Sequence, residues 1–340
     1  MRTRELIIVE PGRIELQERE LDERLGPKEA LLATEHSIIS AGTEGAAFTG
    51  LVLEMPSGGN VRYPLSTGYG HLGRVLAVGS AVTACRPGDR VLTFSRHASV
   101  VKANTERMAL PVPPDAPGPR LVFTRMAGVS ITALRSSTVQ PGDTVVVIGA
   151  GLVGNFAAQL FELAGAEVMV ADVAEMRLEK ARACGVRRAA SAVGDALERA
   201  VDEWTGGQGA QVVVEAIGNS EVIDRAVRLT RRYGEVILLG SPRARATFDV
   251  TPMLSRIHLE AIRVIGSLEW RWPMQATDRG RDIQQNYRLL AGWIAAGRLA
   301  VDPLLTHLVS PADCQSVFEM VTQRKEDSLG VVFDWSRVGQ

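Results

Sequence analysis

The sequence predicts a two-domain α/β protein that joins a doubly wound parallel sheet to a smaller β-rich unit. The chain has 340 residues, which is more than one hydrophobic core usually serves. Roughly its first hundred residues contain short β-rich runs between Gly and Pro turns, with few helical patterns. The middle of the chain alternates apolar runs with helical stretches, which is typical of a parallel sheet covered on both faces.

The β-rich unit is predicted from the runs ELIIVE, EALLATEHSII and GRVLAVGSAV, which begin at Glu5, Glu29 and Gly73. Valine and isoleucine are enriched in strands, and the glycines and prolines between the runs favour turns. The proline-rich stretch PVPPDAPGP at 111–119 marks a change of texture. We therefore expect the domain junction shortly after it.

The parallel sheet is predicted from four apolar runs of strand length. They are TVVVIGAG, AEVMVAD, AQVVVEAIG and GEVILLGS, which begin at residues 144, 166, 210 and 234. Further along, the patterns predict a helix at 282–298, a strand at 304–310, a helix at 314–322 and a strand at 330–336. We expect these last elements to pack back on the N-terminal unit.

Composition excludes several classes of partner. The chain carries 38 basic and 39 acidic side chains, a formal charge of -1, so no nucleic-acid partner is predicted. No apolar run reaches membrane-spanning length, and Leu6 to Val9 is too short for a signal peptide. Three cysteines lie far apart, in neither a disulfide framework nor a metal motif. We expect a cytoplasmic protein that binds no membrane.

The strongest local motif is G-x-G-x-x-G, formed by Gly149, Gly151 and Gly154. It follows an apolar strand and precedes a helix that begins near Leu152 and Val153, which is the context that makes the motif informative. Gly149 permits a tight turn, Gly151 lets the backbone approach a pyrophosphate, and Gly154 allows close helix-to-strand packing. Because the helix N-terminus then faces the anion, we predict a dinucleotide site at these residues.

Asp172 ends the next apolar run and predicts which dinucleotide binds. It lies 18 residues after Gly154 (172 − 154), close to the roughly twenty expected for an acid that binds the ribose. Its carboxylate accepts hydrogen bonds from ribose hydroxyls and repels a 2′-phosphate, so NAD is favoured over NADP. Arg177 either lies along the adenine or faces solvent, and both interpretations stay open.

Four further residues are assigned to the cofactor because they follow later apolar runs. Ligands of doubly wound sheets bind at the carboxyl ends of the strands. We expect this second group to flank the nicotinamide, while strand-ending glycines without ligand contact are the alternative. The group consists of Ile217, Gly218, Gly240 and Ser241.

Together these stretches resemble the medium-chain dehydrogenase/reductase superfamily over essentially the whole chain. The resemblance rests on GTEGAAFTG, GYGHLGRVLAVGSAV with RPGDRV, QPGDTVVVIGAGLVG, MRLEKARACGV and VIGSLE. It implies a GroES-like catalytic domain at 1–125, completed by 269–340, and a Rossmann NAD-binding domain at 126–268. It also implies an active site in the cleft between the domains and a homo-oligomer, dimer or tetramer, built through the Rossmann domain.

The sequence departs from the zinc-dependent members of that superfamily at the expected ligand positions. Those members carry a cysteine before Gly-Thr-Asp, a His-Glu pair and a further acid, where this chain has Ala41, Tyr69 with Gly70, and Arg125. A catalytic zinc needs three ligands from Cys, His, Asp or Glu, so we predict no metal. His71 shares a strand face with Tyr69, yet its partner ligands are not evident.

Without zinc, hydrogen-bond donors or a positive charge must stabilise the alkoxide while hydride leaves. Tyr69 and Arg125 are the candidates, the tyrosine to exchange the proton and the arginine to supply the cation. Thr43 matches a residue that touches the substrate hydroxyl in the family, and Glu44 is either a base or a structural partner. His71 is a candidate proton shuttle. A Tyr69 that only fills the volume of a lost metal is the competing interpretation.

The pattern SIISAGTE, with a tyrosine after Gly68, is most similar to the zinc-independent branch that includes bacteriochlorophyllide a dehydrogenase. Members of that branch oxidise a secondary alcohol to a ketone with NAD. We therefore predict an NAD-dependent, zinc-independent dehydrogenase of a small-molecule alcohol. The first alternative is an NADPH-dependent quinone or enoyl reductase of the same superfamily, against which Asp172 counts. The second is a non-catalytic NAD(H)-binding protein.

Overall fold

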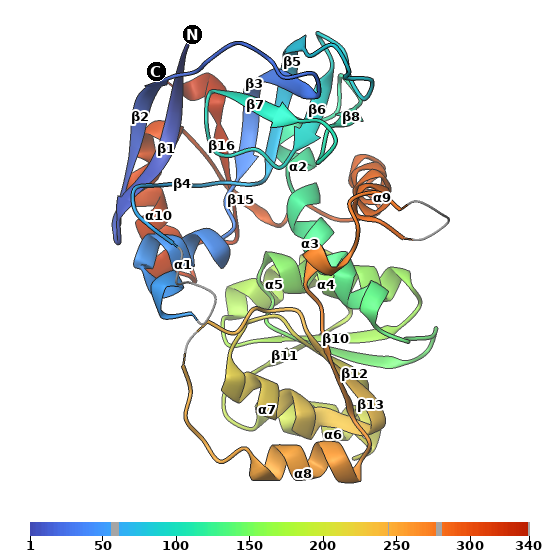
Figure 1. The fold of residues 1–340 in the computed structure, drawn as a ribbon. Coiled ribbons are helices and arrows are strands. Elements are labelled where there is room, and N and C mark those ends of the chain that lie inside the picture. Colours follow the sequence, from blue (N-terminus) through green and yellow to red (C-terminus); the bar gives the residue numbers. More distant parts are fainter. Residues whose placement is uncertain (56–60, 244, 277–280, 339–340) are drawn as a thin grey trace. The chain divides into compact units, whose positions relative to one another are not determined.

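A computed structural model describes residues 1–55, 61–243, 245–276 and 281–338. The chain divides into two compact units (Figure 1). The first combines Met1–Arg125 with Trp272–Gln340, and the second is the continuous stretch Met126–Arg271. The first unit is thus assembled from two separate stretches of the chain, and each unit has its own hydrophobic core.

The second unit is built on a parallel sheet of six strands. They are β9 (Thr144–Ile148), β10 (Glu167–Asp172), β11 (Arg188–Ser191), β12 (Ala210–Glu215), β13 (Thr230–Leu238) and β14 (Arg263–Gly266). Their order is β11-β10-β9-β12-β13-β14, and every neighbouring pair is parallel. The order reverses at β9, as in doubly wound sheets that bind dinucleotides. A parallel sheet in one unit, together with a separate β-rich unit, confirms the predicted α/β class.

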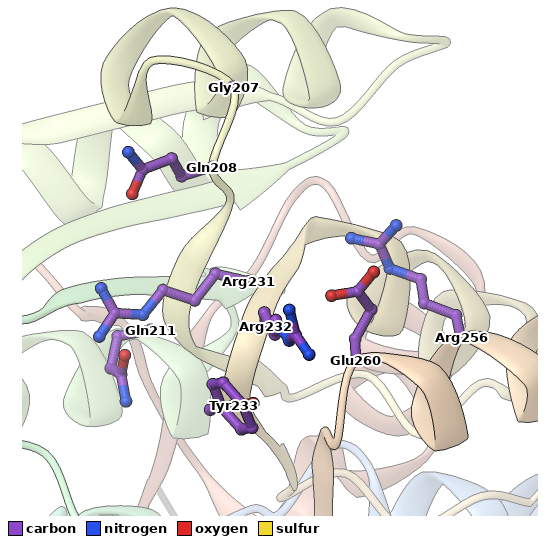
Figure 2. Close-up of a pocket in the computed structure, with 8 residues that line it drawn as sticks. All are labelled: Gly207, Gln208, Gln211, Arg231, Arg232, Tyr233, Arg256 and Glu260. Carbon is purple, nitrogen blue, oxygen red and sulfur yellow. The ribbon is translucent and has the colours of Figure 1, made fainter.

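Helices cover both faces of this sheet (Figure 1). Successive residues of β9 point to opposite faces, so Val145 packs towards α4 and α5 while Val146 packs towards α6 and α7. A cavity of about 530 Å³ opens at the edge where β12 and β13 begin (Figure 2). The helices are α3 (Thr124–Ser136), α4 (Leu152–Leu163), α5 (Glu175–Ala183), α6 (Ala196–Thr205), α7 (Ser220–Leu229) and α8 (Thr251–Leu259), with the 3-10 turn η3 (Glu269–Arg271).

The described residues of the first unit form two sheets. The smaller has the order β2-β1-β4, from β1 (Arg2–Glu10), β2 (Arg13–Glu20) and β4 (Leu65–Ser66). The larger has the order β15-β16-β3-β5-β6-β8, and β7 also pairs with β3. Its strands are β3 (Glu29–Ile38), β5 (His71–Val78), β6 (Arg90–Thr93), β7 (Val100–Asn104), β8 (Leu110–Val112), β15 (Leu305–Val309) and β16 (Gly330–Asp334).

The first unit also contains a helix in a region for which the sequence predicts few helical patterns. This is α1 (Thr43–Thr49), whose Phe48 ring lies 5.5 Å from the Phe318 ring of α10. Among the residues that the structure describes, no helix is long and apolar enough to cross a membrane. The remaining elements are α2 (Gly118–Leu121), α9 (Ile283–Ala295), α10 (Cys314–Gln323), η1 (Leu51–Glu54), η4 (Pro311–Asp313) and η5 (Trp335–Arg337).

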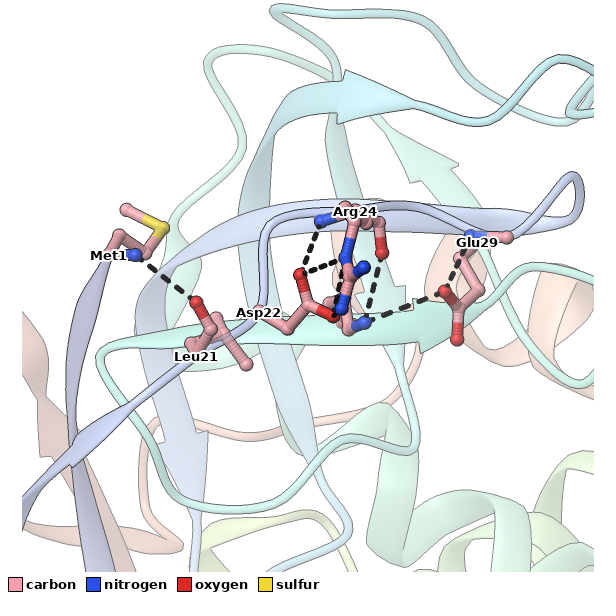
Figure 3. Close-up of polar contacts among 7 residues, drawn as sticks. Met1, Leu21, Asp22, Arg24 and Glu29 are labelled. Carbon is pink, nitrogen blue, oxygen red and sulfur yellow. Dashed lines mark hydrogen bonds and ion pairs between the residues drawn. The ribbon is translucent and has the colours of Figure 1, made fainter.

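Polar contacts fix the start of the chain and the turn after β2 (Figure 3). The Met1 amino group donates to the Leu21 carbonyl at 3.1 Å. The guanidinium of Arg24 then binds the Asp22 carboxylate at 2.7 Å and, by hydrogen bonding, holds the pKa of that carboxyl well below its usual range. The beginning of β1 and the end of β2 are therefore joined at their open end.

Candidate active site

Arg125 is held against aromatic rings inside the first unit. It lies in the first turn of α3 with only 4% of its surface exposed. Its guanidinium carbon lies 4.4 Å from the centroid of the Tyr69 ring and 5.0 Å from that of Phe94. Such faces attract a cation through the ring quadrupole. A Cβ at Gly70 would lie 2.9 Å from Arg125 Cγ, so a small residue there makes room for the arginine.

Tyr287 of α9 also contacts this guanidinium, and sequence reasoning missed it. Its hydroxyl accepts a hydrogen bond from Arg125 Nη1. Its ring meets the Phe94 ring edge-on, with centroids 5.1 Å apart. Tyr287 is buried in the apolar stripe of its helix, so nothing in the sequence distinguishes it from a core residue. Arg125 is therefore positioned by three aromatic residues from different parts of the chain.

The hydroxyl of Tyr69 belongs to a cluster of three hydroxyl groups. It donates to Ser40 Oγ at 2.6 Å and lies 3.4 Å from Thr43 Oγ1. Ser40 is buried, whereas Thr43 begins α1 and is exposed. Ser40 is a second residue that the sequence did not single out, because an isolated serine carries no spacing signal. The cluster connects an exposed hydroxyl to a buried one through Tyr69.

Glu44 lies in a buried network behind this cluster. One carboxylate oxygen accepts from the Ser40 backbone N–H at 2.8 Å. The other accepts from Thr67 Oγ1 at 2.7 Å and lies 2.9 Å from His97 Nε2. His97 Nδ1 in turn lies 2.7 Å from Ser37 Oγ. Glu44 is thus engaged by three groups and fixes the loop that carries Ser40 and Thr43.

His71 is buried between two threonines at the start of β5. Its Nε2 lies 3.0 Å from Thr34 Oγ1, and its Nδ1 lies 2.9 Å from Thr93 Oγ1. The Thr34 hydroxyl donates a hydrogen bond to the Ala98 carbonyl, so Thr34 Oγ1 acts as the acceptor of His71 Nε2–H. Burial lowers the pKa of His71 to about 3, with a smaller contribution from nearby His97. The imidazole is therefore neutral at physiological pH.

The side chains at the positions where the resemblance implies zinc ligands do not fit a zinc ion. Tyr69 and Arg125 stand there with Ala41 and Gly70, and Arg125 brings a positive charge. No group of three or more His, Cys, Asp or Glu side chains suited to a metal occurs within the described residues. A tetrahedral site needs such a group.

The glycine loop after β9 has the geometry of a phosphate cradle. Gly149 has φ of 103°, and its N–H donates to the Ala171 carbonyl at 2.7 Å. A Cβ at Gly154 would lie 1.7 Å from Gly149 O, so only glycine fits there. A Cβ at Gly151 would meet nothing within 4 Å, so open space lies beside this backbone. These residues therefore fit a bound pyrophosphate.

The first turn of α4 begins directly after that open space. Leu152 is buried and Val153 is half-buried, so their side chains anchor the turn in the core. Ser130 Oγ donates to the Val153 carbonyl at 2.8 Å. The N–H groups of a first helical turn have no partner within the helix, which leaves them available to an anion.

Asp172, at the end of β10, is tied to the same loop. One carboxylate oxygen accepts from the Ala150 N–H at 2.8 Å and the other from the Ala174 N–H at 2.9 Å. Arg177 Nη1 lies 3.5 Å from this carboxylate. Asp172 is 4% exposed, so its orientation is fixed by backbone. The structure thus brings together the glycine loop, the acid and Arg177.

The loops after β12 and β13 pack against each other. A Cβ at Gly218 would lie 2.2 Å from Ser241 O, and one at Gly240 would lie 2.2 Å from Gly218 N. The adjoining Ile217 is 49% exposed at this carboxyl edge of the sheet. The four residues predicted to flank the nicotinamide therefore lie together in two touching loops.

Glu215 holds the first of these loops and was missed by sequence reasoning. The side chain is fully buried, and its Oε1 accepts from the N–H groups of Ile217 and Gly218 at 2.8 and 2.7 Å. Burial raises the pKa of Glu215, while the backbone donors act in the opposite direction. The apolar run AQVVVE offered no sign that its last residue would cap the following loop.

Part of the chain matches a protein-family model. Residues 153–278 match the model described as zinc-binding dehydrogenase. The matched stretch begins within the glycine motif and does not include residues 41–125, where the zinc ligands of this family were sought in the sequence.

Known proteins resemble the chain over most of its length. The L-threonine 3-dehydrogenase of Anaeromyxobacter sp. (strain K) is 27% identical over 306 residues, covering 81% of this chain and 83% of the relative. An Escherichia coli oxidoreductase/dehydrogenase of unknown specificity has a TM-score of 0.82 at 22% identity, covering 98% and 99% of the two chains. A putative zinc-binding dehydrogenase from Sinorhizobium meliloti 1021, bound to NADP, has a TM-score of 0.79 at 20% identity, covering 98% and 99%.

Proposed function

Because the chain is an oxidoreductase of the medium-chain dehydrogenase/reductase superfamily, we propose that it transfers a hydride between a secondary alcohol or its ketone and NAD(H), without a catalytic metal. The observation that carries the proposal is the Arg125 guanidinium packed on Tyr69, whose hydroxyl donates to Ser40. A catalytic zinc stabilises the alkoxide and promotes loss of the hydroxyl proton, and a cation beside a proton-exchanging hydroxyl can take over both functions.

Tyr69 handles the substrate proton in this proposal. Its oxygen lies between buried Ser40 and exposed Thr43, so a substrate hydroxyl that reaches Thr43 also reaches the tyrosine. In ketone reduction, Tyr69 gives its hydroxyl proton to the substrate oxygen as hydride arrives, which leaves a tyrosinate beside the Arg125 cation. In alcohol oxidation, that tyrosinate takes the hydroxyl proton back. Arg125 favours the negative charge that develops on the substrate oxygen, because fixed charges act strongly in a site that excludes water.

Glu44 and His71 are positioning residues in this proposal. Glu44 has its oxygens engaged by the Ser40 backbone, Thr67 and His97, so it holds the loop in place. His71 is neutral at physiological pH and lies between Thr34 and Thr93. Neither side chain is available to carry the substrate proton.

The cofactor binds to the second unit in this proposal. The open backbone at Gly151 and the first turn of α4, at Leu152 and Val153, receive the pyrophosphate. The N–H groups of Ala150 and Ala174 each occupy one lone pair of the Asp172 carboxylate. Its remaining lone pairs accept hydrogen bonds from the ribose hydroxyls. The touching loops at 217–218 and 240–241 would flank the nicotinamide, which would supply the hydride chemistry when bound.

We propose NAD rather than NADP because Asp172 presents a buried negative charge where a 2′-phosphate would lie. Arg177, 3.5 Å away, offsets part of that charge. The solved dehydrogenase from Sinorhizobium meliloti is bound to NADP. This neighbour keeps open the alternative of an NADPH-dependent quinone or enoyl reductase. A cofactor-binding protein without turnover is the other alternative.

Two further parts of the proposal concern the setting of the enzyme. We propose that it works in the cytoplasm as a dimer or tetramer formed through the second unit. The exposed edge strand β14, in which Val264 is 41% exposed, offers a surface for that association. We propose that the first unit is the catalytic domain. We also propose that the protein belongs to the zinc-independent branch of the superfamily.

The first experiment is a fluorescence titration of the purified protein with NADH and with NADPH. We expect NADH to bind at least about tenfold more tightly, a difference of about 1.4 kcal/mol. Asp172→Asn should narrow that difference by removing the charge that repels the 2′-phosphate. Tighter binding of NADPH would replace the proposal with the double-bond reductase. Binding without turnover in a screen of secondary alcohols and ketones would favour the non-catalytic alternative.

A further inference from the structure

The second unit contains a cavity at the edge of its sheet opposite to the glycine loop. The cavity has a volume of about 530 Å³ and lies where β12 and β13 begin (Figure 2). The glycine loop follows the carboxyl end of β9, and all six strands are parallel, so the two features are at opposite ends of the strands. Residues that line it include Gln211, Arg231, Arg232, Tyr233, Arg256 and Glu260.

A large bulge in β13 builds one wall of the cavity. Ala210 pairs with Thr230 and Val212 with Glu235, so Gln211 alone stands opposite residues 231–234. Tyr233 in this bulge has φ of 61°, and its N–H donates to the Glu260 carbonyl at 2.8 Å. A tyrosine in the left-handed region is unfavourable unless its surroundings fix it, and such residues gather at binding sites.

The bulge directs two arginines to the surface beside the cavity. Figure 2 shows Arg231, Arg232 and Tyr233 leaving one segment, with Arg256 and Glu260 on a neighbouring helix end. The guanidinium carbon of Arg232 lies 5.0 Å from the Tyr233 ring centroid, which restricts its orientation. Within the described ranges, neither Arg231 nor Arg232 has a carboxylate within ion-pair distance.

The third arginine is already held in place by backbone. Arg256 Nε donates to the Val227 carbonyl at 3.2 Å, and its Nη2 donates to the Thr230 carbonyl at 3.1 Å. Its other N–H groups remain for a ligand. The lining therefore presents three guanidinium groups and one carboxylate, that of Glu260. The buried Gln211 Oε1 accepts no hydrogen bond from any described residue.

We propose that this cavity binds a small phosphorylated molecule. Guanidinium groups match phosphate oxygens in geometry and charge, which makes clustered arginines a recurrent phosphate site. Glu260 and Gln211 supply acceptors for hydroxyl or amino groups on the rest of the ligand. The volume is that of a small-molecule pocket.

The test uses inorganic pyrophosphate as the probe in isothermal titration calorimetry. The parent protein carries Gly151→Asp, whose carboxylate extends into the open space beside the glycine loop and keeps anions from that loop. In this background, Arg231→Gln with Arg232→Gln removes two cavity cations. Arg182→Gln with Arg228→Gln removes two exposed cations from α5 and α7 of the same unit and serves as the matched control.

We expect the parent to bind pyrophosphate at one site. The cavity variant should raise the dissociation constant about tenfold or more, since charged hydrogen bonds are lost. The control variant should change it less than about twofold, because exposed charges act weakly. Absence of binding by the parent, or an equal loss in both double variants, would overturn the proposal. Equal affinity for malonate would overturn the assignment to phosphate.

Discussion

The guanidinium carbon of Arg125 lies 4.4 Å from the centroid of the Tyr69 ring, and Tyr287 binds the same guanidinium from α9. The Tyr69 hydroxyl points towards Ser40. The face of the Tyr69 ring therefore contacts the Arg125 guanidinium, while its hydroxyl belongs to the cluster with Ser40 and Thr43. This pairing places a positive charge and a proton donor side by side at positions where the resemblance to zinc dehydrogenases leads one to look for a metal.

Arg125→Met removes the positive charge while retaining most of the side-chain volume. We expect kcat for alcohol oxidation to fall about 100-fold or more, since losing one such electrostatic stabiliser typically costs about 10²–10³ in rate. Arg125→Lys retains the charge but not the planar stacking, so its kcat should lie between those of the wild type and Arg125→Met. NADH binding should not change, because the cofactor residues belong to the other unit. Equal kcat values in all three proteins would exclude an electrostatic role for Arg125.

Metal removal should leave the enzyme active. We expect unchanged turnover after exhaustive dialysis against a chelator, because the described residues include no group of three metal-ligating side chains. Elemental analysis of the purified protein should find no stoichiometric zinc. If chelation abolished activity and added zinc restored it, the metal-free mechanism would be wrong.

Alanine substitutions at two glycines of the same motif should have different effects, one on stability and the other on cofactor binding. A Cβ at Gly154 would lie 1.7 Å from Gly149 O, so Gly154→Ala should destabilise the second unit by about 3 kcal/mol. Gly151 has φ of -61° and open space beside it, so Gly151→Ala should fold normally but weaken NADH binding about tenfold. Thermal melting and NADH titration separate the two effects, and wild-type affinity in Gly151→Ala would argue against a pyrophosphate there.

His71 should make the first unit sensitive to mild acid. Burial lowers its folded pKa to about 3, below the value of about 6.5 expected in the unfolded chain. Between those values the unfolded state binds more protons, so stability decreases as pH decreases, by up to about 1.4 kcal/mol per pH unit.

The comparison with His71→Gln isolates this residue from other groups that titrate. Urea unfolding at pH 6.5 and pH 5 should show a loss of stability about 2 kcal/mol larger in the wild type than in the variant. Parallel losses in the two proteins would mean that His71 is not held neutral.

In the second unit, the sequence predicted the four strands that are buried on both faces and missed the edge strand β11. The runs at β9, β10, β12 and β13 are apolar because helices cover both sides of the sheet. The edge strand β11 is RAAS and partly exposed, so it needs no apolar run and produced no signal. Helix α1 was missed because its packing against α10, rather than a long periodic pattern, stabilises it.

The cofactor residues were easier to propose than the residues around Arg125. Gly149, Gly151 and Gly154 form a contiguous motif, and Asp172 follows at a spacing that a βαβ unit determines. Tyr69 and Arg125 are far apart in the sequence, and only the positions implied by a resemblance connected them. Tyr287 reaches the same point from α9, and no local pattern predicts that contact.

Strand β16 lies between β15 and β3, so residues 330–334 complete a sheet whose other members are mostly encoded before residue 113. During translation, β3 therefore emerges long before β16. Residues 36–38 of β3, which pair with β16, stay unpaired in the meantime, and an unpaired strand edge is prone to aggregation. The second unit is one continuous stretch of chain, so it can fold before the first unit is fully synthesised. In cells, chaperones should consequently bind most to nascent chains that extend past residue 271 but whose β16 has not yet emerged from the ribosome. Truncated products should end in the same interval.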